Sequence, residues 1–447
     1  MSDVAFIEGG VECTPLHITS LHQQIADEGI STGRQDSYPL HFAAAHSSVT
    51  TFKYLVEKAC SLKSAQHELM RLRDNEGFTP LHSAVSSGSL EMVECCLQYG
   101  SPIELTENTG HTALHMACAQ GSPNIVEILL NSEDGCKVID HKSFVGQTAL
   151  HTAAKYNHID VAKVLIKRGC KLDEKDNDGL TPLLLGCFMD SWQTSWLLLE
   201  HGASLTNTDA KGRNLLHFVV YKASTIISMP ISLYKSVERN LSSLVNVQDI
   251  DGNSPLHCAV EYGGSNQVHR MLYLGGAPWL HNNQLQTPFH IAAALGRSDC
   301  IQIMMKTPSK LSINQVGLRN QTPVHQAAGN GHVEVVRILL KSGAITRGDL
   351  FGQTPFHASA KGGHTEVARE LLTLRSRSML NELDKLGNTA LHLAAMEDHP
   401  HMVSFLLTEH AQLIPNAKGD YVFDVATDSL NRKATIALTL HDRWCCA

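Results

Sequence analysis

The sequence predicts an all-α solenoid of about twelve repeats with projecting β-hairpin fingers. Three observations lead to this fold class: a short phrase ending in histidine recurs, its copies lie about 33 residues apart, and an apolar segment with helical periodicity follows. Because a unit of this size cannot bury its apolar face alone, neighbouring units must stack to form a continuous core. The copies of the phrase end at His41, His82, His115, His151, His217, His257, His290, His325, His357 and His392.

The phrase itself predicts the start of a helix. In Thr79-Pro80-Leu81-His82, threonine suits the helix N-cap, and proline suits the first helical position, where no N–H group is needed. Small residues follow the phrase, as in Ala327-Ala328, and leave a narrow apolar face on which neighbouring helices can pack closely. We therefore expect each repeat to begin with a short helix.

A second helix is expected after the first, and residues 331–344 give the clearest pattern. Apolar side chains at positions 333, 335, 336, 338, 339 and 340 form one broad face, and Gly343 is expected to end the helix. An Asp-x-x-Gly turn then precedes the next phrase, as at residues 349–352. This turn chemistry favours a projecting hairpin finger.

Two weaker copies complete the count of repeats. Leu184 stands where a histidine is expected, and residues 421–424 form a degraded last copy, as is common in a repeat that caps a solenoid. We expect residues 38–440 to form the solenoid, with an insertion at about 222–244 that protrudes as a loop. Residues 1–37 are expected to be an N-terminal segment or partial cap, and residues 441–447 a C-terminal tail.

Composition excludes several classes of protein. The formal net charge is -8, and the charges of both signs are interspersed, so nucleic-acid binding is not expected. The chain has no run of eighteen apolar residues and no signal peptide, so no membrane insertion of this sequence is expected. Its 12 cysteines show no C-x-x-C spacing, which fits free thiols in a reducing cytoplasm.

A period near 33 with the pattern T-P-L-H-x-A is the signature of ankyrin repeats, so we expect an ankyrin repeat solenoid. Departures from the consensus resemble one family, the ankyrin-type (TRPA) transient receptor potential cation channels. They include the repeat without histidine at residues 179–185, the phrase before the long insertion at 212–218, and the stretch at 384–395. The terminal Arg443-Trp444 is similar as well, and the resemblance covers roughly residues 70–444.

That resemblance implies the cytosolic sensor or regulatory arm of a calcium-permeable, non-selective cation channel opened by irritant chemicals or temperature. In the family the polypeptide continues into six membrane helices, so we expect this chain to be a truncated isoform or fragment. Its expected partners are proteins, among them full-length TRPA subunits, at the cytosolic face of the plasma membrane. Alone, the chain is expected to be a cytoplasmic monomer. The alternative is a soluble ankyrin-repeat adaptor for protein–protein interaction.

No enzyme signature is present, and neither a cofactor nor a metal site is expected. The repeated histidines are expected to hydrogen-bond backbone and the threonine of their own phrase, because copies 33 residues apart do not give the close pair typical of zinc. The histidines to which we assign this structural role are His82, His115, His151, His257, His290, His325, His357 and His392.

Two further sets of residues are expected to be functional: finger residues that contact a protein partner, and cysteines that react with electrophiles. Projecting fingers suit protein binding, and the finger residues expected to contact a partner are Asp176, Asp178, Asp209, Lys211, Asp249, Asp251, Arg319, Asp349 and Asp384. Cys136, Cys170 and Cys300 lie near expected loops or helix ends and are expected to be accessible, possible sensors of electrophiles. Lys167-Arg168 precede Cys170 and should lower the pKa of its thiol.

Overall fold

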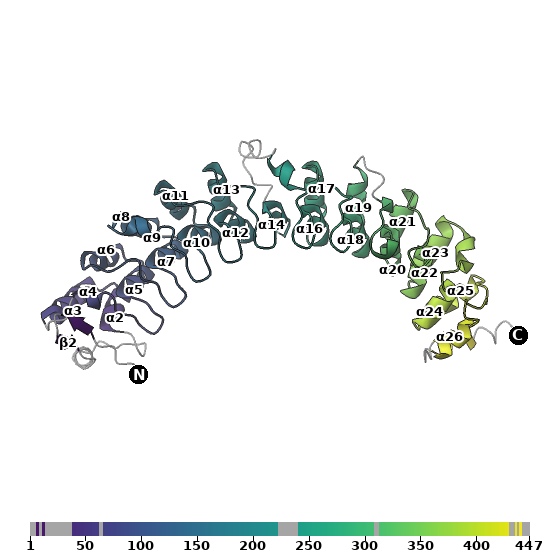
Figure 1. Ribbon diagram of the computed structural model, residues 1–447, viewed down its shortest axis with the longest axis horizontal. Coiled ribbons are helices and arrows are strands. Elements are labelled where there is room, and N and C mark those ends of the chain that lie inside the picture. The colour runs from purple at the N-terminus through teal and green to yellow at the C-terminus, as the bar shows by residue number, and fades with distance from the viewer. Residues whose placement is uncertain are drawn as a thin grey trace. The chain divides into compact units, whose positions relative to one another are not determined.

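The structure is a computed structural model that describes residues 6–8, 11–13, 38–61, 66–221, 240–307, 313–428, 434–435 and 438–439 (Figure 1). Pairs of short antiparallel helices repeat along it, which confirms the helical solenoid. Near the N-terminus, β1 (Phe6–Glu8) and β2 (Val11–Cys13) pair antiparallel. The rest of residues 1–37 and the expected tail 441–447 lie outside the described residues. Contacts divide the chain near residue 210 into two units.

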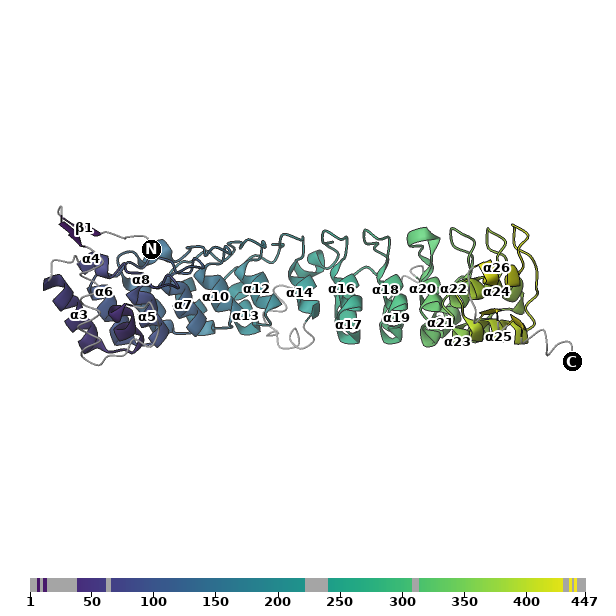
Figure 2. The same cartoon turned by 90° about the horizontal axis from the view of Figure 1, so that it is seen from below.

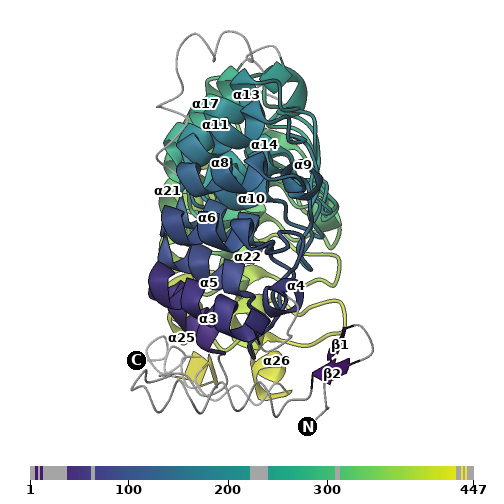
Figure 3. The ribbon, with the colours of Figure 1, turned by 90° about the vertical axis from the view of Figure 1, so that its left-hand side faces the viewer.

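In the first unit, each repeat contributes one helix to an inner layer and one to an outer layer. Inner helices pack on inner helices, as α5 does on α7 (Figure 1), and outer helices pack on outer ones, as α8 does on α11 (Figure 3). The inner helices are α2 (Pro39–Ala45), α5 (Pro80–Ser87), α7 (Ala113–Gln120), α10 (Ala149–Lys155) and α12 (Pro182–Phe188). The outer helices are α3 (Val49–Ser61), α6 (Leu90–Gln98), α8 (Pro123–Asn131), α11 (Ile159–Lys167) and α13 (Trp192–Glu200), and the short α4 (Gln66–Leu69) and α9 (Gly135–Val138) follow α3 and α8.

The second unit has the same two layers, and its finger loops lie along one edge of it (Figure 2). Its inner helices are α14 (Leu215–Tyr221), α16 (Pro255–Glu261), α18 (Pro288–Ala294), α20 (Pro323–Gly329), α22 (Pro355–Lys361), α24 (Ala390–Met396) and α26 (Val422–Asp428). Its outer helices are α17 (Ser265–Tyr273), α19 (Ser298–Met305), α21 (Val333–Lys341), α23 (Thr365–Leu374) and α25 (Pro400–Thr408), and two short 3-10 helices are η3 (Leu318–Asn320) and η4 (Arg377–Asn381).

Helix starts follow the chemistry of the phrase. Thr322 lies in extended backbone before α20, Pro323 takes the first helical position, and His325 completes a reciprocal cap with Thr322. In α21, Val335, Val336, Leu339 and Leu340 are buried. The expected apolar face was too broad, because Val333 and Ile338 are only half-buried.

The expected insertion at about 222–244 falls mostly outside the described residues, since residues 222–239 are not described. Its last part is helical rather than a loop: residues 240–244 form helix, and Leu241 and Leu244 are buried. These two leucines therefore belong to the core of the second unit.

Candidate interaction surface

Most of the phrase histidines join their helix start to the finger that follows; His82 and His41 depart from this, because the Nε2 atom of His82 and the Nδ1 atom of His41 have no hydrogen-bond partner among the described residues. The Nδ1 atom of His151 accepts a hydrogen bond from the Thr148 amide at 3.1 Å, and its Nε2 atom donates to the Leu180 carbonyl oxygen at 3.0 Å. For His82 the Nδ1 contact with the Thr79 amide is 3.1 Å. Carbonyl oxygens lie 2.8–3.3 Å from the Nε2 atoms of His41, His115, His217, His257, His290, His325, His357 and His392.

Burial keeps these histidines neutral. It lowers the pKa of His115 to about 4, although the hydrogen bond to the Gln147 carbonyl acts in the opposite direction. The pKa values of His82, His257 and His290 are also lowered to about 4, with burial as the largest cause. A neutral imidazole has one donor and one acceptor nitrogen, which is what the two contacts require.

In several fingers, an aspartate at the first position of the turn holds the turn from inside. The Oδ1 atom of Asp349 accepts hydrogen bonds from the amides of Phe351 (2.9 Å) and Gln353 (3.0 Å). The corresponding amides lie 2.8–3.0 Å from Oδ1 of Asp176, Asp249 and Asp384. A carboxylate with two amide donors favours this tight turn.

The structure therefore corrects part of the expected finger contacts. The side chains of Asp176, Asp209, Asp349 and Asp384 are buried, and that of Asp249 is half-buried, so they are not placed to meet a partner. The side chains of Asp178, Lys211, Asp251 and Arg319 are exposed on the fingers.

Backbone hydrogen bonds tie successive finger tips together. In the second unit, the Leu350 amide donates to the Arg319 carbonyl oxygen at 2.7 Å, and the Lys385 amide donates to the Phe351 carbonyl oxygen at 2.9 Å. The equivalent bonds elsewhere are Asn108 to Glu76, Phe144 to Thr109, Asn177 to Val145, Ala210 to Asp178, Ile250 to Lys211, Asn283 to Asp251 and Ala417 to Leu386. In the described part of the second unit, the equivalent bond from the Leu318 amide to the Gln284 carbonyl oxygen is not formed.

Exposed apolar side chains at the tips are a feature that the sequence reading missed. In the second unit, the exposed fraction is 67% for Ile250, 57% for Leu318 and 63% for Leu386. Leu285, Leu350 and Phe351 are exposed on the intervening fingers. The signal was available, since these residues occupy the turn positions where polar residues are usual. We call Ile250, Leu285, Leu318, Leu350, Phe351 and Leu386 the tip row.

Shallow hollows lie between the fingers and the inner helices. One in the second unit has a volume of about 510 Å³ and is lined by Arg319, Phe351 and Lys361, among others. The Arg319 guanidinium lies over the Phe351 ring, 5.6 Å from its centroid. One in the first unit, of about 580 Å³, is lined by Val145 and Tyr156, among others. These hollows and the tips together present mixed polar and apolar chemistry suited to a polypeptide partner.

Two of the three thiols expected to be accessible are buried. Cys136 is exposed, but Cys170 and Cys300 are buried. Burial raises the pKa of Cys170 to about 12, and Asp140 acts in the same direction. Burial likewise raises the pKa of Cys300 to about 11. The expected effect of Lys167 and Arg168 on Cys170 was wrong, because desolvation is the largest influence on this thiol.

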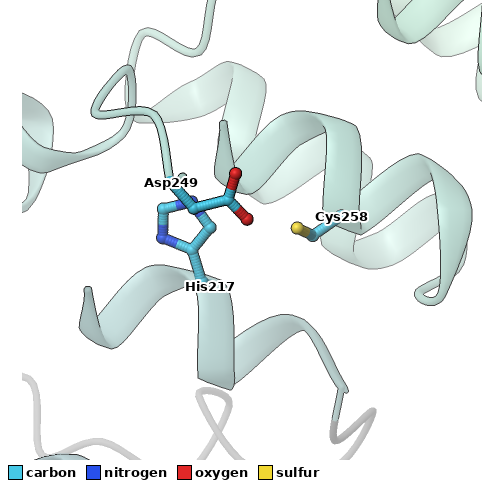
Figure 4. Close-up of side chains that lie close together, drawn as sticks. All are labelled: His217, Asp249 and Cys258. Carbon is cyan, nitrogen blue, oxygen red and sulfur yellow. The ribbon is translucent and has the colours of Figure 1, made fainter. Parts of the chain in front are cut away.

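Three potential metal ligands also lie together in the second unit, and the sequence reading missed them. They are His217, Asp249 and Cys258, and their ligand atoms lie within 4.8 Å of one another (Figure 4). Spacing alone did not reveal them, since the three residues come from two helices and a finger.

Comparison with known families agrees with this geometry. The family model described as "Ankyrin repeats (3 copies)" matches residues 7–95, 61–142, 135–209, 256–349 and 345–418. The chain belongs to the ankyrin-repeat family. Among the described residues, no helix combines the length and the apolar character needed to span a bilayer.

Two similar proteins are channel subunits. The chain is 32% identical over 418 residues to transient receptor potential cation channel subfamily A member 1 of Drosophila melanogaster, which is 91% of this chain and 34% of that protein. It is 33% identical over 270 residues to the Homo sapiens protein of the same name, 60% of this chain and 24% of that protein. This ankyrin-repeat chain therefore spans 34% and 24% of the length of these two relatives.

A solved structure is similar too. The crystal structure of the ankyrin repeat domain of Bcl-3 covers 54% of this chain and 100% of its own, with 24% sequence identity and a TM-score of 0.44.

Proposed function

We propose that this chain is the cytosolic sensor or regulatory arm of a TRPA-like, calcium-permeable, non-selective cation channel that senses chemicals or temperature. The observation that supports this most is the similarity to the Drosophila melanogaster channel subunit across 91% of the chain. In this proposal the arm lies at the cytosolic face of the plasma membrane and acts through contacts with other proteins.

The tip row of the second unit is the proposed contact surface. Its apolar side chains project from successive fingers, with Asp251 and Arg319 exposed among them. A few apolar anchors within a polar rim carry most of the affinity of a typical interface. The backbone hydrogen bonds between successive finger tips, here called the tip ladder, fix the spacing of these anchors except between Leu285 and Leu318, so little further ordering is needed when a partner binds.

Co-expression with a full-length TRPA subunit tests the proposal. Tagged chain should co-purify with the channel subunit and change the agonist-evoked current. Leu386→Asp places a charge on the tip row and should reduce both effects. Tyr273→Ser is the matched control, because Tyr273 is 66% exposed at the end of the outer helix α17.

An unchanged current without co-purification would contradict the channel-arm function. A soluble adaptor is the second candidate, and the match of the ankyrin-repeat family model over most of the chain is compatible with it, because a stack of repeats with projecting fingers suits protein contacts. The adaptor predicts a partner that binds the wild type in cells without any TRPA subunit, and that is lost with Leu386→Asp.

A further inference from the structure

His217, Asp249 and Cys258 converge at one place in the second unit. His217 lies on α14, Asp249 begins the next finger, and Cys258 lies on α16 (Figure 4). His217 and Cys258 are buried, and Asp249 is half-buried. Ligand atoms within 4.8 Å of one another are close enough to share a single ion after small side-chain movements.

We propose that these three side chains bind Zn²⁺. Imidazole nitrogen, carboxylate oxygen and thiolate sulfur are all zinc ligands, and the thiolate selects against Mg²⁺ and Ca²⁺. A thiolate and a carboxylate balance the two positive charges of the ion, so the buried site is neutral overall. Three protein ligands leave the fourth tetrahedral position to a water molecule.

Neighbouring groups support the ligands. The Oδ1 atom of Asp249 accepts hydrogen bonds from the amides of Asp251 (3.0 Å) and Asn253 (2.8 Å), which orient the carboxylate. The Oδ1 atom of Asn214 lies 2.8 Å from Nδ1 of His217. An amide oxygen only accepts, so a proton on Nδ1 can be donated to it while Nε2 binds metal.

Zinc binding exchanges defined bonds and protons. Without metal, the Nε2–H group of His217 donates to the Asn253 carbonyl oxygen at 3.0 Å. Its Nδ1 atom accepts a hydrogen bond from the backbone N–H of Asn214 at 3.1 Å. With metal, the imidazole proton moves from Nε2 to Nδ1 and is donated to the side-chain Oδ1 atom of Asn214. The bonds from Nε2 to the Asn253 carbonyl and from the Asn214 backbone amide to Nδ1 are both broken, and Nε2 turns its lone pair to zinc. The Cys258 thiol releases its proton to solvent as the Zn–S bond forms, so one proton leaves for each ion bound.

Other repeats supply an internal comparison. The histidine and the finger aspartate recur as His325 with Asp349 and as His357 with Asp384. The position equivalent to Cys258 is Ala358 in the first case and Leu393 in the second. The thiol therefore distinguishes this repeat, and the cap residue differs too, since Asn214 stands where those repeats have threonine.

Cobalt substitution in the full, reduced chain tests the proposal, with Co²⁺ as the probe. One equivalent of Co²⁺ should give a thiolate-to-cobalt charge-transfer band, and Zn²⁺ should displace it. Cys258→Ala should abolish the band, whereas Cys300→Ala, which changes another buried cysteine of the same unit, should retain it. Calorimetry in buffers of different ionisation enthalpy should report release of about one proton per ion.

A second variant guards against misfolding. Asp249→Asn removes the carboxylate but keeps the turn, because Asn282 holds the equivalent position of the next finger with two amide bonds. It should weaken Zn²⁺ binding about tenfold or more, and Asp349→Asn, the same change without a nearby thiol, should not. A missing band, a band that persists in Cys258→Ala, or equal Zn²⁺ affinity in Asp249→Asn would overturn the site.

Discussion

The Nε2 atom of His325 lies 3.1 Å from the carbonyl oxygen of Gln353, 28 residues further along the chain. This bond joins the start of α20 to the base of the next finger. Because His325 also caps α20, this one buried side chain contacts both the start of its own helix and the finger of the next repeat.

Replacing His325 should therefore destabilise the solenoid. His325→Ala leaves the Gln353 carbonyl and the Thr322 amide without this partner, at a cost on the order of 1–3 kcal/mol. Denaturant unfolding followed by circular dichroism measures the change, with the half-buried Gln326→Ala as control. Equal stability of His325→Ala and wild type would contradict the structural role.

Truncation in the outer layer should cost more. Leu339 of α21 is fully buried, so Leu339→Ala should lower the free energy of unfolding by about 2–5 kcal/mol. Ile338→Ala on the same helix is the control, since Ile338 is only half-buried and should cost clearly less. Similar losses for the two variants would contradict the packing of this helix.

Stability should fall as the pH falls from about 6.5 towards 4. Burial lowers the pKa of His115 and His290 from 6.5 to about 4, so in this window the unfolded chain binds more protons than the folded chain. The same direction holds for His41, His151, His325, His357 and His392. The neutral-pH stability is therefore lost progressively as acid is added.

The denaturation midpoint at pH 7 and at pH 5 tests this linkage. Both pH values lie above 4.5, the ordinary pKa of a glutamate. The pKa values of Glu107, Glu174 and Glu370 are lowered below it in the folded chain, so these carboxylates stay charged there at both pH values. A midpoint that does not decrease between pH 7 and pH 5 would show that the histidines are not buried as the structure has them.

Thiol labelling should separate Cys136 from Cys170 and Cys300. The first is exposed, whereas burial raises the pKa values of the other two to about 12 and about 11. Brief alkylation of the native chain followed by peptide mass spectrometry should modify Cys136 and spare the other two, and denatured chain should be modified at all three. Rapid native labelling of Cys170 would contradict its burial.

Amide exchange should detect the untied pair of finger tips. The Leu350 amide takes part in the tip ladder, whereas the Leu318 amide has no ladder bond to Gln284. Hydrogen exchange should therefore be faster at Leu318 than at Leu350, although both tips are solvent-exposed. Equal protection would mean that the ladder does not restrain the tips.

Features that depend on residues adjacent in the sequence could be predicted, whereas features that depend on burial and on contacts between distant residues could not. Pro80 and Pro323 begin helices as expected, because cap and first turn lie within four residues. The Asp-x-x-Gly pattern predicts the turn but does not reveal that Asp349 points inward while Arg319 is exposed. The environment of Cys170 was misjudged from its chain neighbours Lys167 and Arg168, because burial and Asp140 dominate it.

The missing tip bond between Gln284 and Leu318 has a mechanical consequence. In a linear stack, each repeat is held by its interactions with its neighbours. The finger tips at Gln284 and Leu318 lack the backbone hydrogen bond that joins the tips of the adjoining fingers. A force drawn along the second unit would spread this pair of fingers before the others. We therefore expect the second unit to bend most readily at this pair of fingers, and a partner that bridged Leu285 and Leu318 should stiffen it.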